Sequence, residues 1–298
     1  MNSLTMIRDI INGNAAYLAP AVFNPLCAKL AEQAGFKVLY LGGGPLGYVK
    51  TVLEANLGLT ETVQAGVEIR AACGLPLILD GTCGWGDPMH VGFTVRAAEA
   101  AGFCAIEIED QVLPKRAHHH VGIEHMIPQE AMVAKVHEAV HARQDLDFVI
   151  IARTNGVRAS SMDDALRRAS AYREAGADVI YLSPRTAEEM RFVGERLGPP
   201  LMFSLPGDGL QSFGMSLDDA GALGFRLISV TTPTLWFHRA MKQGYEALAA
   251  GKPVPALAGT SRQAEQDALH ETLDLEALLA LERDTVESPP DRSVERDE

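Results

Sequence analysis

The sequence predicts an α/β protein, a (β/α)8 barrel of the TIM type with a C-terminal helical extension, and three observations lead to this prediction. A unit that reads as helix, glycine and apolar strand recurs five times along the 298 residues. Three further apolar runs raise the number of expected strands to eight. Eight such units in about 250 residues match the usual size of this barrel.

The recurring unit is marked by a glycine that stands just after each predicted helix. Glycine supplies the left-handed backbone conformation with which many helices end. The apolar runs that follow lack polar alternation, as is typical of strands buried on both faces. The glycines are Gly35, Gly74, Gly102, Gly176 and Gly224. In chain order, the predicted strands span residues 17–23, 38–41, 77–79, 105–108, 148–152, 179–182, 201–205 and 227–230.

A doubly wound parallel sheet is the main alternative for such a pattern. It is disfavoured because dinucleotide-binding sheets of this type carry a Gly-x-Gly-x-x-Gly turn after a strand. Gly42, Gly43 and Gly44 do follow a strand, but Pro45 comes next and the required spacing is missing.

The composition is that of an ordinary enzyme with an acidic surface, 47% hydrophobic and with a net charge of −13. An acidic surface disfavours nucleic acid as a partner. The four cysteines lack the spacing of zinc ligands or of a disulfide framework, which suits a reducing compartment. No secretory signal or membrane-length apolar run is visible, so we expect a cytoplasmic protein without membrane contact.

The C-terminal part differs from the rest of the chain. We expect a barrel over residues 1–258, a helical extension over 259–284 and a disordered acidic tail over 285–298. From residue 271 onward the chain holds ten acidic and three basic residues, so this part carries −7 of the net charge. Leucines at helical spacing in the extension favour a helix that packs on a barrel or on a neighbouring subunit.

Polar side chains stand where the predicted strands end. Asp80 follows the third strand, Glu109 the fourth and Arg153 the fifth. Because the carboxyl ends of barrel strands meet on one rim, we expect these residues to converge, with Gly42 to Gly44, Asn155, Ser183 and Ser204 beside them. Carboxylates suit Mg²⁺, and an arginine can hold a carboxylate with two parallel hydrogen bonds. The rim is therefore a candidate site for a divalent ion and an anionic substrate.

A long connection, residues 111–128, follows the fourth strand. Connections of this length after barrel strands are commonly lids over the site. This one carries Lys115, Arg116, His118, His119, His120 and His125. The histidines could bind a transition metal or move protons near neutral pH, and the plain alternative is a solvated loop.

Five segments together resemble the isocitrate lyase/phosphoenolpyruvate mutase superfamily. They are FNP (23–25), LGGG (41–44), DGTCGWG (80–86), IEDQ (108–111) and IARTN (151–155), and the similarity runs from about residue 7 to residue 250. Members include isocitrate, methylisocitrate and dimethylmalate lyases, phosphonopyruvate hydrolase, phosphoenolpyruvate mutase and oxaloacetate decarboxylase. The resemblance implies a tetramer of pairs that exchange a C-terminal helix, and Mg²⁺ or Mn²⁺ holding a 2-oxo acid or its enolate.

The resemblance also implies roles for single residues. Asp80 matches the direct metal ligand and Glu109 the glutamate that binds the metal through water. Arg153 matches the substrate-binding arginine, and the amides around Gly43 and Gly44 match the turn that receives the substrate carboxylate. Lys115 begins the part of the lid that closes over the substrate.

Four departures from the family pattern bear on the chemistry. The second aspartate of the metal motif is Thr82, and an aspartate before the second helix corresponds to Asn56, so two negative charges are missing. The lid cysteine that serves the lyases as an acid is Ala117, which leaves His118 and His119 as candidate proton donors. Ser183 stands where lyases have glutamate and the mutase has histidine.

These features predict a carbon–carbon lyase, a decarboxylase or retro-aldol enzyme acting on a small 2-oxo or 2-hydroxy di- or tricarboxylic acid through a pyruvate-like enolate. Arg153, Lys115, His118 and His119 are the predicted catalytic residues. One alternative is a phosphonate enzyme acting on phosphonopyruvate, since Lys115, Arg116 and Arg153 could hold the phosphonate charge. The other is a barrel without metal that serves as a binding or scaffold protein.

Overall fold

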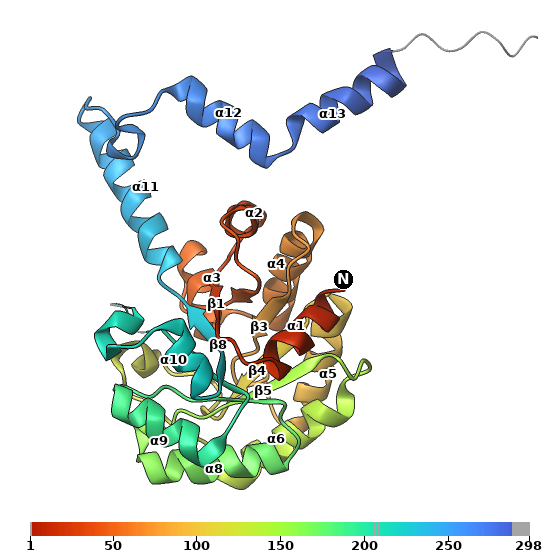
Figure 1. Ribbon diagram of the computed structural model, residues 1–298, viewed down its shortest axis with the longest axis vertical. Coiled ribbons are helices and arrows are strands. Elements are labelled where there is room, and N and C mark those ends of the chain that lie inside the picture. Colours follow the sequence, from red (N-terminus) through yellow and green to blue (C-terminus); the bar gives the residue numbers. More distant parts are fainter. Residues whose placement is uncertain (1, 206, 208, 288–298) are drawn as a thin grey trace, which may run out of the picture. The chain divides into compact units, whose positions relative to one another are not determined.

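Eight parallel strands form a nearly closed barrel with helices between them, which confirms the predicted fold class (Figure 1). The computed structural model describes residues 2–205, 207 and 209–287. The strand order is β1-β8-β7-β6-β5-β4-β3-β2. The last gap, between β1 and β2, is spanned by an isolated bridge from Ala21 to Tyr40 and by a 2.9 Å hydrogen bond from the Val22 amide to the Tyr40 carbonyl.

The strands are short and their residues are almost all buried, as the apolar runs indicate. They are β1 Tyr17–Pro20, β2 Leu39–Leu41, β3 Leu77–Asp80, β4 Ala105–Glu109, β5 Val149–Arg153, β6 Val179–Tyr181, β7 Leu201–Ser204 and β8 Phe225–Val230. The α-helices are α1 Ser3–Asn12, α2 Pro25–Gln33, α3 Gly43–Val49, α4 Leu59–Ala72, α5 Pro88–Ala100, α6 Gln129–Ala142, α7 Gly156–Ala159, α8 Met162–Glu174, α9 Ala187–Leu197, α10 Leu217–Ala222, α11 Pro233–Ala249, α12 Arg262–Thr272 and α13 Leu275–Glu282. The 3₁₀ turns are η1 Glu54–Asn56, η2 Ala117–Val121, η3 Leu210–Phe213 and η4 Pro255–Leu257, and a π-helical turn, η5, spans Arg283–Glu287.

The helices begin and end where their sequences predict. The Asn24 side chain accepts a hydrogen bond from the Cys27 amide at the start of α2, and Ser161 caps α8 in the same way. Gly102 and Gly176 follow helices with φ of 82° and 103°, the left-handed region that glycine enters without strain. Four of the five unit glycines have this left-handed backbone, and Gly74, after α4, is the exception.

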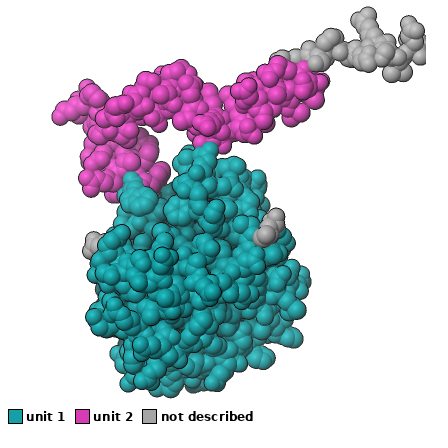
Figure 2. All heavy atoms as spheres, in the orientation of Figure 1, with its two compact units in different colours: residues 1–236 teal, residues 237–298 magenta. Residues whose placement is uncertain are grey.

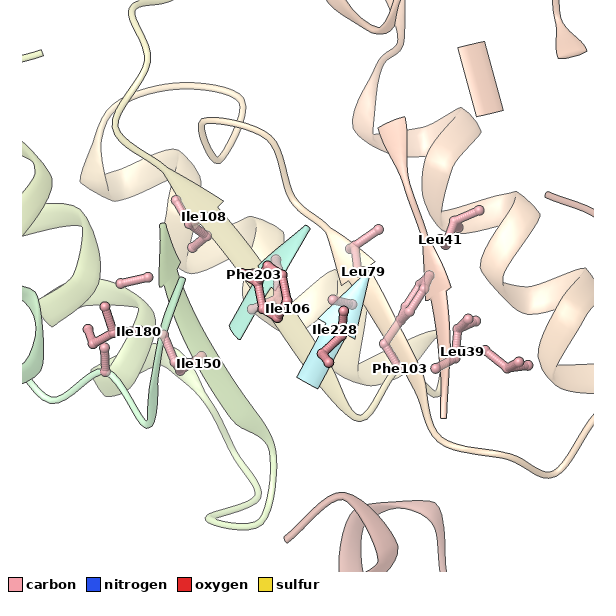
Figure 3. Packing of buried hydrophobic residues seen from close by; sticks show 14 of the residues in the cluster. Leu39, Leu41, Leu79, Phe103, Ile106, Ile108, Ile150, Ile180, Phe203 and Ile228 are labelled. Carbon is pink, nitrogen blue, oxygen red and sulfur yellow. The ribbon is translucent and has the colours of Figure 1, made fainter. Parts of the chain in front are cut away.

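The barrel has two layers of apolar side chains, because successive residues of a strand point to opposite faces. One layer lies between the strands and the helices, and Figure 3 shows Leu39, Leu79 and Ile106 in it. The other fills the barrel interior with Val38, Ile78, Val149 and their neighbours, and α1 adds Ile7, Ile10 and Ile11 to it. The helix α1 therefore covers the end of the barrel at which the strands begin.

The chain divides into two compact units, residues 1–236 and residues 237–298 (Figure 2). The first unit contains the whole barrel. In the second unit, α12 and α13 and the turn between them expose large apolar side chains, namely Leu269, Leu273, Leu278, Leu279 and Leu281. The domain boundaries expected at 258 and 284 stay predictions, and the expected tail from residue 288 lies outside the described residues. Among the described helices, none is both long and apolar enough to span a membrane.

Candidate active site

A cavity of about 550 Å³ lies at the carboxyl ends of the barrel strands. Its walls come from residues that end or directly follow strands, among them Gly42, Gly44, Asp80, Arg153, Ser183, Ser204 and Thr231. The structure therefore brings together most of the polar residues that the sequence places at strand ends.

The inward-facing set follows from the two-residue period of the strands. In β4 the side chains of Ile106 and Ile108 pack between strands and helices, so Glu107 and Glu109 point into the barrel. The same alternation turns Asp80 and Arg153 inward, because Leu79 and Ala152 belong to the outer layer. Four ionisable side chains thus share the inner face.

Asp80 is held by two backbone amides. Its Oδ2 accepts a 2.9 Å hydrogen bond from the Gly43 amide, and its Oδ1 accepts a 3.0 Å hydrogen bond from the Thr82 amide. A Cβ on Gly43 would lie 2.9 Å from the Glu54 carboxylate, so only glycine fits at this close approach. The Gly43 amide is therefore engaged by Asp80, and the cavity wall itself is formed by Gly42 and Gly44.

Lys115 reaches from the lid into a buried cluster of carboxylates. Its Nζ contacts Glu109 Oε1 directly and lies 2.6 Å from Glu54 Oε1, and the three side chains are each at most 6% exposed. Burial alone would lower the pKa of Lys115, but Glu109 and Glu54 raise it above its ordinary value. Burial likewise favours a raised pKa for Glu109, but Lys115 and Arg153 hold it well below its usual range. Both groups therefore stay charged.

Arg153 is the other buried cation. Its Nη1 donates a 2.9 Å hydrogen bond to Glu107 Oε1, its Nε lies 3.5 Å from Glu109 Oε2, and its guanidinium lies 4.8 Å from the centre of the Tyr181 ring. Glu107 also accepts a 2.7 Å hydrogen bond from the Tyr40 hydroxyl. Burial, opposed by Arg153, raises the pKa of Glu107 to about 8. This network fixes the guanidinium against the cavity wall.

Asn155 lies behind the cavity rather than on its described wall. Its Nδ2 donates a 2.9 Å hydrogen bond to Glu109 Oε2, and its Oδ1 lies 3.3 Å from Arg153 Nη2. Its own amide donates to Asp110, which also accepts from the Thr154 and Tyr172 hydroxyls. These contacts support Glu109 and Arg153, and substrate binding by Asn155 stays a prediction.

The lid, residues 111–128, leaves the barrel and returns to it, and its two ends are paired with each other. A bridge pairs Gln111 with Met126, and the Val112 amide donates a 2.8 Å hydrogen bond to the His125 carbonyl. The lid histidines have different surroundings. His119 and His120 line the cavity, whereas His118 is exposed and lies 3.3 Å from His125. The structure therefore brings His119 to the site but leaves the predicted catalytic His118 outside its described wall.

Two charged residues of the site escaped the sequence reasoning. Glu54 is buried beside Lys115 and Gly43, whereas Asn56, which was matched to the missing aspartate, is exposed. The sequence places two missing negative charges at Thr82 and Asn56. The structure supplies one negative charge nearby through Glu54, in the turn η1. Glu107 was also missed, although the alternation of β4 was sufficient to place it on the same face as Glu109.

The donor set fits a hard divalent cation. Asp80 and Glu109 offer carboxylate oxygens beside the Thr82 turn, and Mg²⁺ is usually bound by one or two carboxylates while it keeps several waters. Across the described residues, no group of three or more histidine, cysteine, aspartate or glutamate side chains forms a metal cluster. The ammonium of Lys115 lies between Glu109 and Glu54 and neutralises part of their charge.

Comparisons with known proteins find similar sequences and similar solved structures. The family description "Phosphoenolpyruvate phosphomutase" matches residues 7–249. The chain is 37% identical over 203 residues to 2,3-dimethylmalate lyase of Eubacterium barkeri, covering 66% of this chain and 69% of the relative. It is 34% identical over 241 residues to 2-methylisocitrate lyase of Aeropyrum pernix, covering 80% and 76%. The solved complex of phosphonopyruvate hydrolase with oxalate and Mg²⁺ has a TM-score of 0.83 at 27% identity, covering 96% of this chain and 100% of that one.

Proposed function

The chain belongs to the phosphoenolpyruvate phosphomutase family, and from this premise we propose that it is a metal-dependent carbon–carbon lyase acting on a small 2-oxo or 2-hydroxy di- or tricarboxylic acid. Members of this superfamily are metal-dependent lyases, mutases and hydrolases that act on pyruvate-like substrates. The finer proposal is that cleavage leaves a pyruvate-like enolate in the cavity.

The observation that carries the proposal is Arg153, which contacts Glu109 and lines the same cavity as Asp80. The guanidinium is pinned by Glu107 and Glu109 and still borders the cavity. A fixed planar guanidinium recognises a carboxylate with two hydrogen bonds at little conformational cost. Gly42 and Gly44 line the same cavity, so backbone can approach the other end of that carboxylate.

Mg²⁺ or Mn²⁺ is the proposed cofactor, with Asp80 as its direct ligand and Glu109 as a ligand through water. When bound, such an ion polarises a keto oxygen and stabilises charge that develops on it. The protein residues bind and orient the substrate, exclude water and transfer the proton. Arg153 orients the carboxylate, Lys115 closes the lid against Glu54 and Glu109 and excludes water, and His119 transfers a proton at the cavity wall.

A panel of 2-oxo, 2-hydroxy and phosphono acids, assayed with Mg²⁺ for pyruvate and phosphate, tests this function. We expect pyruvate or another 2-oxo acid from a di- or tricarboxylate, and loss of that activity in Asp80→Ala. Unchanged turnover in Asp80→Ala, or no cleavage of any carboxylate in the panel, would overturn the proposal.

A phosphonate substrate is the second candidate, because cations gather on the outer cavity wall. Arg158 and Arg185 line the cavity in addition to Arg153, and the family includes the phosphonopyruvate hydrolase described above. Release of phosphate together with pyruvate from phosphonopyruvate would favour this second candidate. The scaffold alternative predicts no binding of Mg²⁺ or Mn²⁺ even with oxalate present, which calorimetry measures directly.

The proposed partner is a second copy of this chain, in a dimer of dimers located in the cytoplasm. The exposed leucines of α12 and α13 support an association of the second unit, since large clustered apolar side chains are typical of interfaces. Light scattering and sedimentation of the full chain measure the oligomeric state, and a monomer at micromolar concentration would contradict this proposal.

A further inference from the structure

We propose that Glu124 is a positioning residue that orients His119, and that His119 is the proton-transferring residue of the cavity in place of the lid cysteine. This inference rests on the proposed function, because it assigns the proton step of that reaction. Position 117, which holds the cysteine in the lyases, is an exposed alanine, and its methyl group has no acidic proton to transfer.

The two ring nitrogens of His119 face different groups. Nδ1 lies 2.8 Å from Glu124 Oε2, and Nε2 lies 3.4 Å from Glu54 Oε1 at the cavity. A carboxylate thus lies beside each ring nitrogen, and the one at hydrogen-bond distance is on Nδ1. The neutral ring therefore keeps its proton on Nδ1, and Nε2 is left to accept or donate a proton at the cavity. His119 is 20% exposed, whereas the Glu124 side chain is fully buried. Glu124 therefore fixes the ring at Nδ1, and the opposite edge of the ring faces the cavity.

Glu124 is itself held in place. Its Oε1 lies 3.2 Å from Arg158 Nη1, and the Gln111 side-chain amide donates to Oε2. The Gln111 Nε2 also lies 2.9 Å from His119 Nδ1. When Nδ1 carries the proton, the two nitrogens direct their hydrogens to the same Glu124 oxygen. Burial favours a raised pKa for Glu124, but His119 and Arg158 lower it below its ordinary value, so the group is a carboxylate at neutral pH.

The other lid histidines have no comparable support among the described residues. His120 Nδ1 lies 3.2 Å from the Tyr48 hydroxyl, a neutral partner, and His118 pairs with His125 in an exposed position. Neither contacts a buried carboxylate in the described part of the chain. Among the lid histidines in the described part of the chain, His119 is thus the one that both contacts a buried carboxylate and lines the cavity.

The proton step balances with this pair alone. After cleavage, the electron pair of the broken carbon–carbon bond resides on the enolate. His119 acts as the imidazolium, with a proton on each ring nitrogen. It gives the Nε2 proton to the enolate carbon, a C–H bond forms as the N–H bond breaks, and a neutral imidazole with Nδ1–H on Glu124 remains. The imidazole regains a proton from water when the lid opens.

Imidazole ¹⁵N NMR of the full-length protein, with His119→Gln used to identify the signal, reads the tautomer without any turnover. At a pH where the ring is neutral, we expect the Nδ1–H form in the wild type and in Glu130→Gln, a control at an exposed glutamate. In Glu124→Ala we expect a mixture of tautomers, and in Glu124→Gln, which keeps an acceptor oxygen, a smaller change. An unchanged tautomer in Glu124→Ala would overturn the positioning role.

Kinetics on the best acid of the panel gives the second readout. We expect Glu124→Ala to lower kcat by roughly 10- to 100-fold with KM within about twofold, and His119→Ala to lower kcat by roughly 100-fold or more, with partial rescue by added imidazole. A carbanion protonated by enzyme also gives stereospecific deuterium uptake in D₂O, which becomes racemic when His119 is lost. Full kcat in His119→Ala would refute the proton role. If the wild type cleaves no acid, the proposed function fails, while the NMR result still decides the relation between Glu124 and His119.

Discussion

Lys115 and Glu54 form a buried ion pair with 2.6 Å between Nζ and Oε1. Lys115 comes from the lid after β4, and Glu54 comes from the turn η1 that follows α3. Since Lys115 also contacts Glu109, its ammonium connects two loops to the end of a barrel strand. Lid closure and the charge of the site are therefore set by the same side chain.

Removal of the Lys115 charge is expected to strengthen binding of a divalent ion. In Lys115→Met, Glu54 and Glu109 lose their nearest cation, and affinity for a hard cation rises with ligand charge. We expect Mn²⁺ to bind roughly tenfold more tightly by calorimetry, while activity falls because the lid no longer closes. Lys50→Met, at an exposed lysine, is the matched control. Weaker Mn²⁺ binding in Lys115→Met would contradict the assignment of this carboxylate cluster.

Glu54 and Asn56 allow a direct comparison of a buried with an exposed residue on one turn. Glu54→Gln removes one carboxylate from Lys115 and from His119, so we expect kcat/KM to fall roughly tenfold or more. Asn56→Ala should leave it within about twofold. The ratio of the two effects, measured with the same substrate, decides which residue belongs to the site.

Arg153→Lys is expected to lower activity although the charge is kept. Lysine cannot form the two parallel hydrogen bonds of a guanidinium, and a hydrogen bond to a charged group contributes about 1.5–3 kcal/mol. A loss of this size is roughly 10- to 150-fold in kcat/KM. Steady-state kinetics with a carboxylate substrate measures it, and a variant with full activity would show that Arg153 does not bind the substrate.

Acid is expected to release the lid through Glu124. Its pKa is lowered below the ordinary value of 4.5, so the stability it contributes is complete above pH 4.5 and is lost as pH falls through the lowered pKa of the folded state. Hydrogen exchange of residues 112–127, corrected for intrinsic rates, should therefore speed up below about pH 4.5 relative to the barrel strands. Glu124→Gln should show fast lid exchange at every pH, and a wild-type lid that stays protected in acid would disprove this role.

Gly66→Ala is expected to destabilise the barrel without touching the site. A Cβ at Gly66 in α4 would lie 2.1 Å from Cζ of Phe103, which is buried just before β4. Overpacking of this kind costs about 1–3 kcal/mol. Urea unfolding should show the loss, whereas Gly74→Ala, where no neighbouring atom lies within 4 Å of the added Cβ, should show none.

The fold was predictable because its signal is repeated. Five units contribute an apolar run and a glycine stop, and three more strands are marked by an apolar run, so an error in one strand leaves the other seven in place. Asp80, Glu109 and Arg153 were accessible by the same logic, since each is the last residue of its strand. The end of a buried strand is a position that the sequence marks clearly.

The remaining site residues lack such a mark. Glu54 stands in a short 3₁₀ turn without periodicity, and its neighbour Asn56 matches a family position more closely although it points to solvent. The distinction among His118, His119 and His120 depends on where Glu124 and Tyr48 lie in space, which consecutive histidines in a sequence do not reveal. Tertiary contacts decide these cases.

The apolar layer that α1 adds to the barrel interior has a consequence for the order of events in turnover. Ile7, Ile10 and Ile11 close the end of the barrel where the strands begin, so the cavity opens at the opposite end, where the lid lies. In the described part of the chain, reactant and both fragments therefore pass through the same end of the barrel. Product-inhibition patterns measure whether the two fragments leave in a fixed order.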